Sequence, residues 1–75
     1  MTWLPLESKM LLSVAYDANR HILYLRFRSG DVYRYFDLPD ETHQQFLLAE
    51  SKGQFFLTNI RSCFRYERMA KLQVA

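Results

Sequence analysis

The sequence predicts a small α+β domain, a three-stranded antiparallel meander followed by two short helices packed on one face. Apolar and polar residues alternate in runs between residues 11 and 36, a pattern typical of half-buried strands. Pro39 is followed by two acidic residues, which indicates a helix start. The chain has 75 residues, 49% hydrophobic and 16% aromatic, enough for one packed core but not for a second domain. This composition excludes disorder along the whole chain.

Three strands are expected before residue 37. The first begins at Leu11 and ends at the turn-rich residues 17–19, and the second covers residues 22–28. A break at residues 29–31 precedes the third strand, residues 32–36. The second and third strands therefore form a hairpin.

The loop of this hairpin decides which side chains share a face, because a shift of one residue moves every side chain to the other face. A three-residue loop, residues 28–30, puts Gly30 where a type I turn with a G1 bulge needs a positive φ. Leu25 then lies opposite Tyr33, and Leu23 lies opposite Tyr35, on the apolar face. The other face carries Tyr24, Arg26, Arg34 and Phe36.

Two helices are expected after the sheet. The first begins at Pro39 and stops at Gly53, which would take the left-handed conformation common after helices. The second is indicated by an apolar repeat at i, i+4, i+7 and i+8, formed by Phe56, Ile60, Cys63 and Phe64. The aromatic residues expected in the core are Phe27, Tyr33, Tyr35, Phe46 and Phe56.

The two ends of the chain are expected to lie outside the folded domain, which covers residues 8–64. Residues 1–7 are expected to form a poorly ordered arm. Residues 65–75 are a basic tail, either a further helical turn or a loose segment.

Little in the sequence supports catalysis, and we predict that the chain is not an enzyme. His21 and His43 have no partner at a spacing that would position them for acid–base work. Cys63 lies on the apolar side of the second helix pattern, so we expect a buried, unreactive thiol. Asp40 and Glu41 are explained by the helix start. The sequence predicts no metal site, no cofactor and no small-molecule substrate.

The formal net charge of +2 conceals a segregation along the chain. The net charge is −1 over residues 1–19, +3 over 20–34, −4 over 35–50 and +4 over 51–75. Basic and aromatic residues interleave in the hairpin, which is typical of surfaces that stack bases and contact phosphates. The same pattern also fits an outward face that is structural or contacts another protein. The candidate nucleic-acid-binding residues are Tyr24, Arg26, Arg34, Lys52, Arg61 and Arg65.

The segment Ser51-Lys52-Gly53 has two interpretations. It is either a plain junction between two helices or a modest phosphate contact at the start of the second helix.

The cysteine count and the hydropathy pattern bear on the compartment. A lone Cys63 cannot form an internal disulfide, which favours a reducing environment. No stretch approaches the roughly 18 apolar residues of a membrane helix, and no basic segment leads into an apolar run at the N-terminus. We therefore expect a cytoplasmic protein without membrane contact.

A series of short motifs spans residues 8 to 64 and resembles the KTSC domain. The motifs are Ser8, Tyr16-Asp17, Ser29-Gly30, Tyr33-Arg34-Tyr35, Leu38-Pro39, Ser51-Lys52-Gly53 and Asn59-Ile60-Arg61. That family is named for the C-terminal region of some lysyl-tRNA synthetases and also occurs as free-standing small bacterial proteins. We interpret Gly30, Tyr33, Tyr35, Pro39 and Gly53 as structural motif residues. Two places differ from the family pattern: Leu38 stands where valine is usual, and residues 62–64 replace a polar turn.

The resemblance implies RNA binding, a role proposed from the fusion to a tRNA synthetase. We predict a non-catalytic module that binds tRNA or single-stranded RNA through an aromatic and basic surface. The alternative is a protein-interaction or homodimerisation module that uses sheet edges and surplus aromatic residues. RNA binding is favoured if a group of arginines converges on the open sheet face, and disfavoured if they scatter or pair with Asp37, Asp40 and Glu41. The arginines are Arg20, Arg26, Arg34, Arg61 and Arg65.

Overall fold

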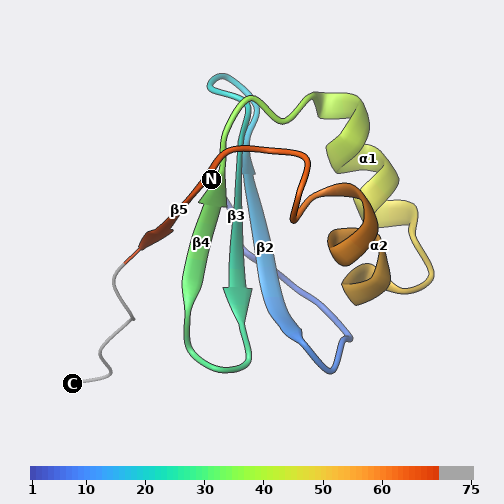
Figure 1. The fold of residues 1–75 in the computed structure, drawn as a ribbon. Coiled ribbons are helices and arrows are strands. Elements are labelled where there is room, and N and C mark those ends of the chain that lie inside the picture. Colours follow the sequence, from blue (N-terminus) through green and yellow to red (C-terminus); the bar gives the residue numbers. More distant parts are fainter. Residues whose placement is uncertain (70–75) are drawn as a thin grey trace.

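A computed structural model of the chain describes residues 1–69. The elements follow in the order β1 (Leu4–Pro5), β2 (Leu11–Asp17), β3 (Ile22–Phe27), β4 (Val32–Tyr35), α1 (Asp40–Leu48), α2 (Lys52–Asn59) and β5 (Tyr66–Met69). The strands form one antiparallel sheet in the order β1-β2-β3-β4-β5. Both helices lie on the same side of this sheet (Figure 1). The predicted α+β class is confirmed, but the described part of the chain forms a five-stranded sheet where three strands were expected.

The N-terminal segment is part of the sheet, so the expectation of a poorly ordered arm is wrong. Leu4 pairs with Val14 and Pro5 pairs with Ser13. The amide of Leu6 donates to the carbonyl of Leu12 at 2.9 Å, and the Leu6 side chain is only 8% exposed. A two-residue strand is too short to show a sequence period, and its order comes from burying Leu6 against residues distant in the sequence.

The C-terminal segment is also a strand, so the helical or loose alternatives are wrong for residues 66–69. Tyr66 pairs with Tyr35, and Met69 pairs with Val32 on β4. Without β5, strand β4 would expose an unpaired edge. The expectation for residues 70–75 lies outside the described part of the chain.

The β3–β4 hairpin has the predicted register. Gly30 has φ of +97°, and its amide donates to the carbonyl of Phe27 at 2.9 Å. Leu25 pairs with Tyr33 across the two strands, and Leu23 pairs with Tyr35. The residue types of one short loop therefore assign both faces of the hairpin correctly.

The junction between the helices differs from the prediction. Helix α1 begins directly after Pro39, as expected, but it ends at Leu48, and the extended residue Ala49 follows it. Gly53 is the second residue of α2 and not a left-handed stop; Ser51 caps this helix by accepting from the amide of Gln54. Since the next helix begins within four residues of Leu48, the chain turns through extended residues and needs no left-handed glycine.

Helix α2 is shorter than the apolar repeat suggested. It ends at Asn59, and the amide of Cys63 then donates to the carbonyl of Ile60 in a turn. Ile60 is buried as expected, but Cys63 is exposed, so the prediction of a buried thiol is wrong. The chain turns here because it must return to the sheet edge to form β5.

The core lies between the helices and the sheet. Phe46 of α1 and Phe56 of α2 pack against the leucines of β2 and β3, and Tyr35 joins them from β4. Phe27 and Tyr33, the other expected core aromatic residues, are partly buried at its border. The fully buried side chains of this core include Leu11, Val14, Leu23, Leu25, Leu38, Phe46 and Ile60.

Candidate nucleic-acid interface

The face of the sheet turned away from the helices carries alternating arginines and aromatic rings. In β4, Tyr33 and Tyr35 take the helix side because they pair with core leucines, so Arg34 between them takes the opposite side. Arg34 pairs with Tyr24 of β3. We call this surface the open face; its residues are Trp3, Tyr24, Arg26, Arg34, Phe36 and Arg65.

Cation–π contacts hold the two sides of the open face. The guanidinium carbon of Arg26 lies 4.4 Å from the centroid of the Trp3 ring, whose edge meets Tyr24 with centroids 6.4 Å apart. On the other side, the Phe36 ring lies 5.4 Å from Arg34 and 4.5 Å from Arg65. The open face is therefore a pre-arranged set of flat groups, and guanidinium planes and rings both stack on bases.

The charges of these arginines are balanced to different degrees. Arg34 donates from Nε to Glu67 at 2.8 Å, and this hydrogen bond raises the pKa of its guanidinium. Arg65 lies 3.9 Å from Asp37, and both side chains are largely exposed. Among the described residues, Arg26 has no ion pair, and its buried Nε has no hydrogen-bond partner. Arg26 is therefore the open-face arginine whose charge no described carboxylate balances.

The predicted binding residues do not all meet. Tyr24, Arg26, Arg34 and Arg65 share the open face, whereas Arg61 borders a groove between α2 and the sheet. Of the other basic residues, Lys52 donates from Nζ to the carbonyl of Ala49. Arg20 lies in the turn between β2 and β3, 4.0 Å from Asp17. Three of the five arginines named in the convergence test thus share one face, whereas Arg20 and Arg61 lie elsewhere and Arg65 is 3.9 Å from Asp37, a pairing that disfavours RNA binding in that test.

Sequence reasoning missed Trp3. Its ring covers Arg26 only because β1 is ordered, and a two-residue strand carries no periodic signal. The one available signal was the single tryptophan of the chain, since such a large ring is rarely left without contacts.

The residues of the Ser-Lys-Gly segment make capping and packing contacts within the domain. Ser51 caps α2, and Lys52 bonds to the preceding turn. A Cβ at Gly53 would lie 3.5 Å from Oγ of Ser8, which itself accepts from the amides of Met10 and Leu11. These contacts support the interpretation of this segment as a junction.

Comparison with known proteins gives the family. The KTSC domain profile matches residues 7–66. The chain belongs to the KTSC domain family. It is 38% identical over 61 residues to a protein of Tsukamurella paurometabola, covering 81% of this chain and 91% of that protein. The crystal structure of a KTSC domain protein from Yersinia pestis matches with a TM-score of 0.89 at 33% identity, over 92% of this chain and 97% of the other.

The same domain is found within larger enzymes. This KTSC chain is 33% identical over 64 residues to the lysine–tRNA ligase of Trichormus variabilis, a match that covers 85% of the chain and 11% of the ligase. The resemblance inferred from the sequence motifs is therefore confirmed.

Apart from the open face, this KTSC domain has a polar cluster at the start of α1. The Tyr16 hydroxyl contacts the carbonyl oxygen of Leu38 at 2.6 Å and Oδ1 of Asp40 at 2.8 Å. The Tyr16 ring stacks on His43 with centroids 4.2 Å apart, and His21 Nε2 is 4.0 Å from the same carboxylate oxygen. Burial and the Asp40 contact raise the pKa of Tyr16, and burial lowers the pKa of His43. The cluster ties β2 to α1.

Two absences among the described residues bear on other roles. Within residues 1–69, no group of three or more histidine, cysteine, aspartate or glutamate side chains is placed to hold a metal ion. No helix in that part of the chain is both long and apolar enough to cross a membrane.

Proposed function

We propose that this KTSC domain is a non-catalytic module that binds single-stranded RNA, including single-stranded parts of tRNA, across its open face. The observation that carries the proposal is the alternation of rings and guanidinium groups on the sheet face that the helices leave bare. Proteins that bind single strands combine stacking platforms with cations along the backbone path. The relative found within a lysine–tRNA ligase supports a nucleic-acid role, because that enzyme acts on tRNA.

The platform would work because its flat groups are already held in place. Arg26 stacks on Trp3, and Glu67 holds the guanidinium of Arg34 beside Phe36. Stacking a base on such a group costs little conformational entropy, because the side chain is already ordered. Arg26, which has no ion pair with a described residue, and Arg65, whose 3.9 Å pair with Asp37 is largely exposed, are then the cations best placed for phosphates, because Arg34 is held closely by Glu67.

The number of available cations sets the salt dependence. Two phosphate contacts on a single strand give a slope of about −1.4 in log K against log salt, so affinity falls about sevenfold between 50 and 200 mM salt. Binding is thus expected to be weak and clearly salt-dependent.

Fluorescence anisotropy of short labelled RNA strands tests this proposal. Arg26→Gln should weaken binding at least threefold, because it removes both a stacking plane and a phosphate contact. Arg20→Gln, which removes an arginine from the β2–β3 turn, serves as the matched control and should leave binding unchanged. Absence of binding at 50 mM salt, or equal losses in the two variants, would refute the proposal.

Self-association through β5 is the second candidate function. Within the described sheet β5 is an edge strand, and three of its four residues are exposed. Such an edge can pair with another strand. Light scattering over a range of protein concentrations tests this candidate: a constant monomer mass excludes it, and a mass that rises to that of a dimer supports it.

A further inference from the structure

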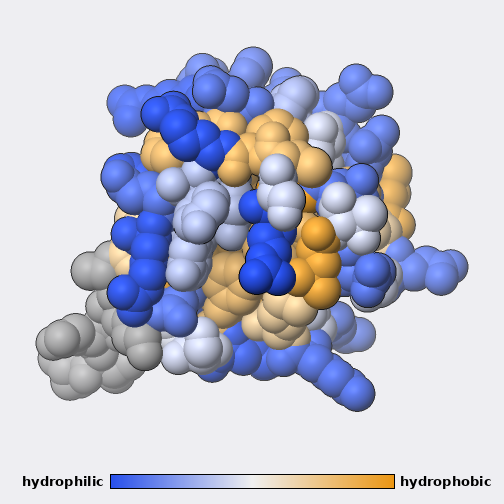
Figure 2. Space-filling view, viewed as in Figure 1, coloured by the Kyte–Doolittle hydropathy of each residue, from blue (hydrophilic) through white to orange (hydrophobic). Residues whose placement is uncertain are grey.

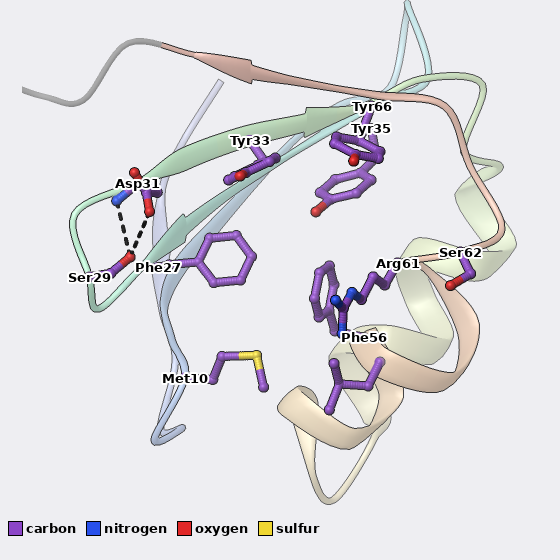
Figure 3. A pocket seen from close by; sticks show the side chains of 11 residues that line it. Met10, Phe27, Ser29, Asp31, Tyr33, Tyr35, Phe56, Arg61, Ser62 and Tyr66 are labelled. Carbon is purple, nitrogen blue, oxygen red and sulfur yellow. Dashed lines mark hydrogen bonds between the residues drawn. The ribbon is translucent and has the colours of Figure 1, made fainter.

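An open groove of about 660 Å³ lies on the other side of the sheet, between its strands and α2. Its sheet side carries Phe27, Tyr33, Tyr35 and Tyr66, and its helix side carries Phe56 and Arg61 (Figure 3). Figure 2 shows hydrophobic and weakly polar surface in the middle of the molecule, interrupted by a strongly hydrophilic patch and surrounded by further strongly hydrophilic residues. We call this cavity the tyrosine groove.

The three tyrosines of the groove form one continuous wall. Tyr35 and Tyr66 are cross-strand partners with ring centroids 5.8 Å apart, and Tyr33 lies 6.4 Å from Tyr35 and 5.7 Å from Tyr66. Phe27 meets the ring of Phe56 edge-on at 5.5 Å. Tyr35 and Phe56 are almost fully buried, so the rings of the wall that a flat aromatic ligand can reach are chiefly those of the exposed Tyr66 and the half-buried Tyr33.

The tyrosine hydroxyls of the groove are open to a ligand, whereas Ser29 at its far end already donates to Asp31 at 3.1 Å. The hydroxyls of the three tyrosines make no hydrogen bond to residues 1–69, although the Tyr35 side chain is only 3% exposed. Burial raises the pKa of Tyr35, partly opposed by the nearby Arg61, so its hydroxyl stays protonated at neutral pH and can donate. Hydroxyl groups beside apolar rings gain from a ligand that hydrogen-bonds to them.

Arg61 supplies the charge of the groove. Its side chain extends toward the groove beside Phe56 (Figure 3). It makes no ion pair with a described residue. At the other end of the groove, the carboxylate of Asp31 is paired with Arg68 at 2.9 Å. Within residues 1–69, the groove therefore presents one positive charge without an ion pair, which complements a single anionic group.

We propose that the tyrosine groove binds a small ligand in which a flat aromatic ring carries one anionic group. The ring lies against the tyrosine wall, and the anionic group contacts Arg61. The groove volume lies within the range of ordinary small-molecule sites. Nucleoside monophosphates and aromatic carboxylates share this chemistry. The inference goes beyond the proposed RNA binding, because the open face is on the other side of the sheet, and it departs from the expectation that no small molecule binds.

NMR titration of the ¹⁵N-labelled chain tests the proposal directly. Adenosine monophosphate and phenylacetate represent the phosphate and carboxylate sources, and adenosine and inorganic phosphate each supply one half of the ligand. At least one of the two ligands that carry both a ring and an anionic group, here called the combined ligands, should shift the amide signals of β4, β5 and residues 60–62 at millimolar concentration. It should bind at least tenfold more tightly than adenosine or inorganic phosphate alone. The tighter of the two combined ligands then identifies the anionic group. Absence of shifts with both, or equal binding of phosphate alone, would overturn the proposal.

Variants on the two sides of the sheet separate this site from the open face. Arg61→Gln should weaken the combined ligand about tenfold or more, and Tyr33→Leu should weaken it by removing one ring of the wall. Arg26→Gln on the open face is the matched control and should bind the ligand normally, whereas it should lose RNA affinity. Because Arg61 is exposed, Arg61→Gln should keep the native spectrum. Unchanged ligand binding in Arg61→Gln, or an equal loss in Arg26→Gln, would contradict the proposal.

Discussion

Replacing Tyr16 by phenylalanine is expected to destabilise the domain measurably, because one hydroxyl joins β2 to the start of α1. The Tyr16 hydroxyl contacts the carbonyl oxygen of Leu38 at 2.6 Å and Oδ1 of Asp40 at 2.8 Å. Phenylalanine keeps the ring that stacks on His43 but removes both polar contacts. The substitution therefore isolates the hydroxyl group.

The size of the effect follows from the surroundings of the two acceptors. The bond to Leu38 is partly buried, so its loss leaves a carbonyl poorly satisfied, whereas Asp40 is exposed and recovers water. The expected loss in the free energy of unfolding is about 1–2 kcal/mol. For a domain of this size that loss lowers Tm by about 4–16 °C.

Thermal or urea unfolding followed by circular dichroism measures this difference. Tyr66→Phe is the matched control: the chemical change is the same, and the hydroxyl of Tyr66 makes no hydrogen bond to residues 1–69. The control should stay within about 0.5 kcal/mol of the parent chain. If Tyr16→Phe were no less stable than Tyr66→Phe, the role given to the Tyr16 cluster would be wrong.

Three further predictions concern pH, glycines and the thiol. Burial lowers the pKa of His43, so the contribution of this residue to the free energy of unfolding is fully present above about pH 6.5 and is lost as pH falls below that value. His43→Gln should therefore flatten the pH dependence of the free energy of unfolding in urea titrations. Gly30→Ala should cost about 1–3 kcal/mol because φ is +97°, whereas Gly53→Ala, in a helix with ordinary contacts, should be neutral or stabilise by up to about 1 kcal/mol. Cys63 is exposed and should react with a thiol reagent without denaturant; protection until unfolding would contradict its placement.

The hairpin and its two faces are predictable because the information is local. Gly30 fixes the loop, the loop fixes the register, and the register places Arg26 and Arg34 on the face opposite Tyr33. The helix start at Pro39 is local in the same sense. A sequence pattern suffices wherever a few neighbouring residues decide the conformation.

The edge strands and the junctions are not predictable in this way. β1 and β5 are short, and their order depends on pairing with strands far away in the sequence. Helix α1 could end in any of several short turns, and the nearby Gly53 led to the wrong prediction of where it ends. The apolar repeat that ends at Cys63 continues past the helix because Ile60 is buried from a turn.

The candidate site was predictable to the same extent. Tyr24, Arg26 and Arg34 follow from the hairpin register, whereas Trp3 and Arg65 reach the open face only through β1 and the segment that leads into β5. Tyr33 and Tyr35 were correctly placed on the helix side. The groove they border with Tyr66 depends on β5 and could not be inferred without it.

The fluorescence of Trp3, the single tryptophan of the chain, tests RNA binding on the open face most directly. Because Trp3 stacks on Arg26, a base added to this platform should quench its emission. The account predicts saturable quenching by single-stranded RNA at 50 mM salt, with about sevenfold weaker affinity at 200 mM. RNA binding without a change in Trp3 emission, or no binding at the lower salt concentration, would contradict it.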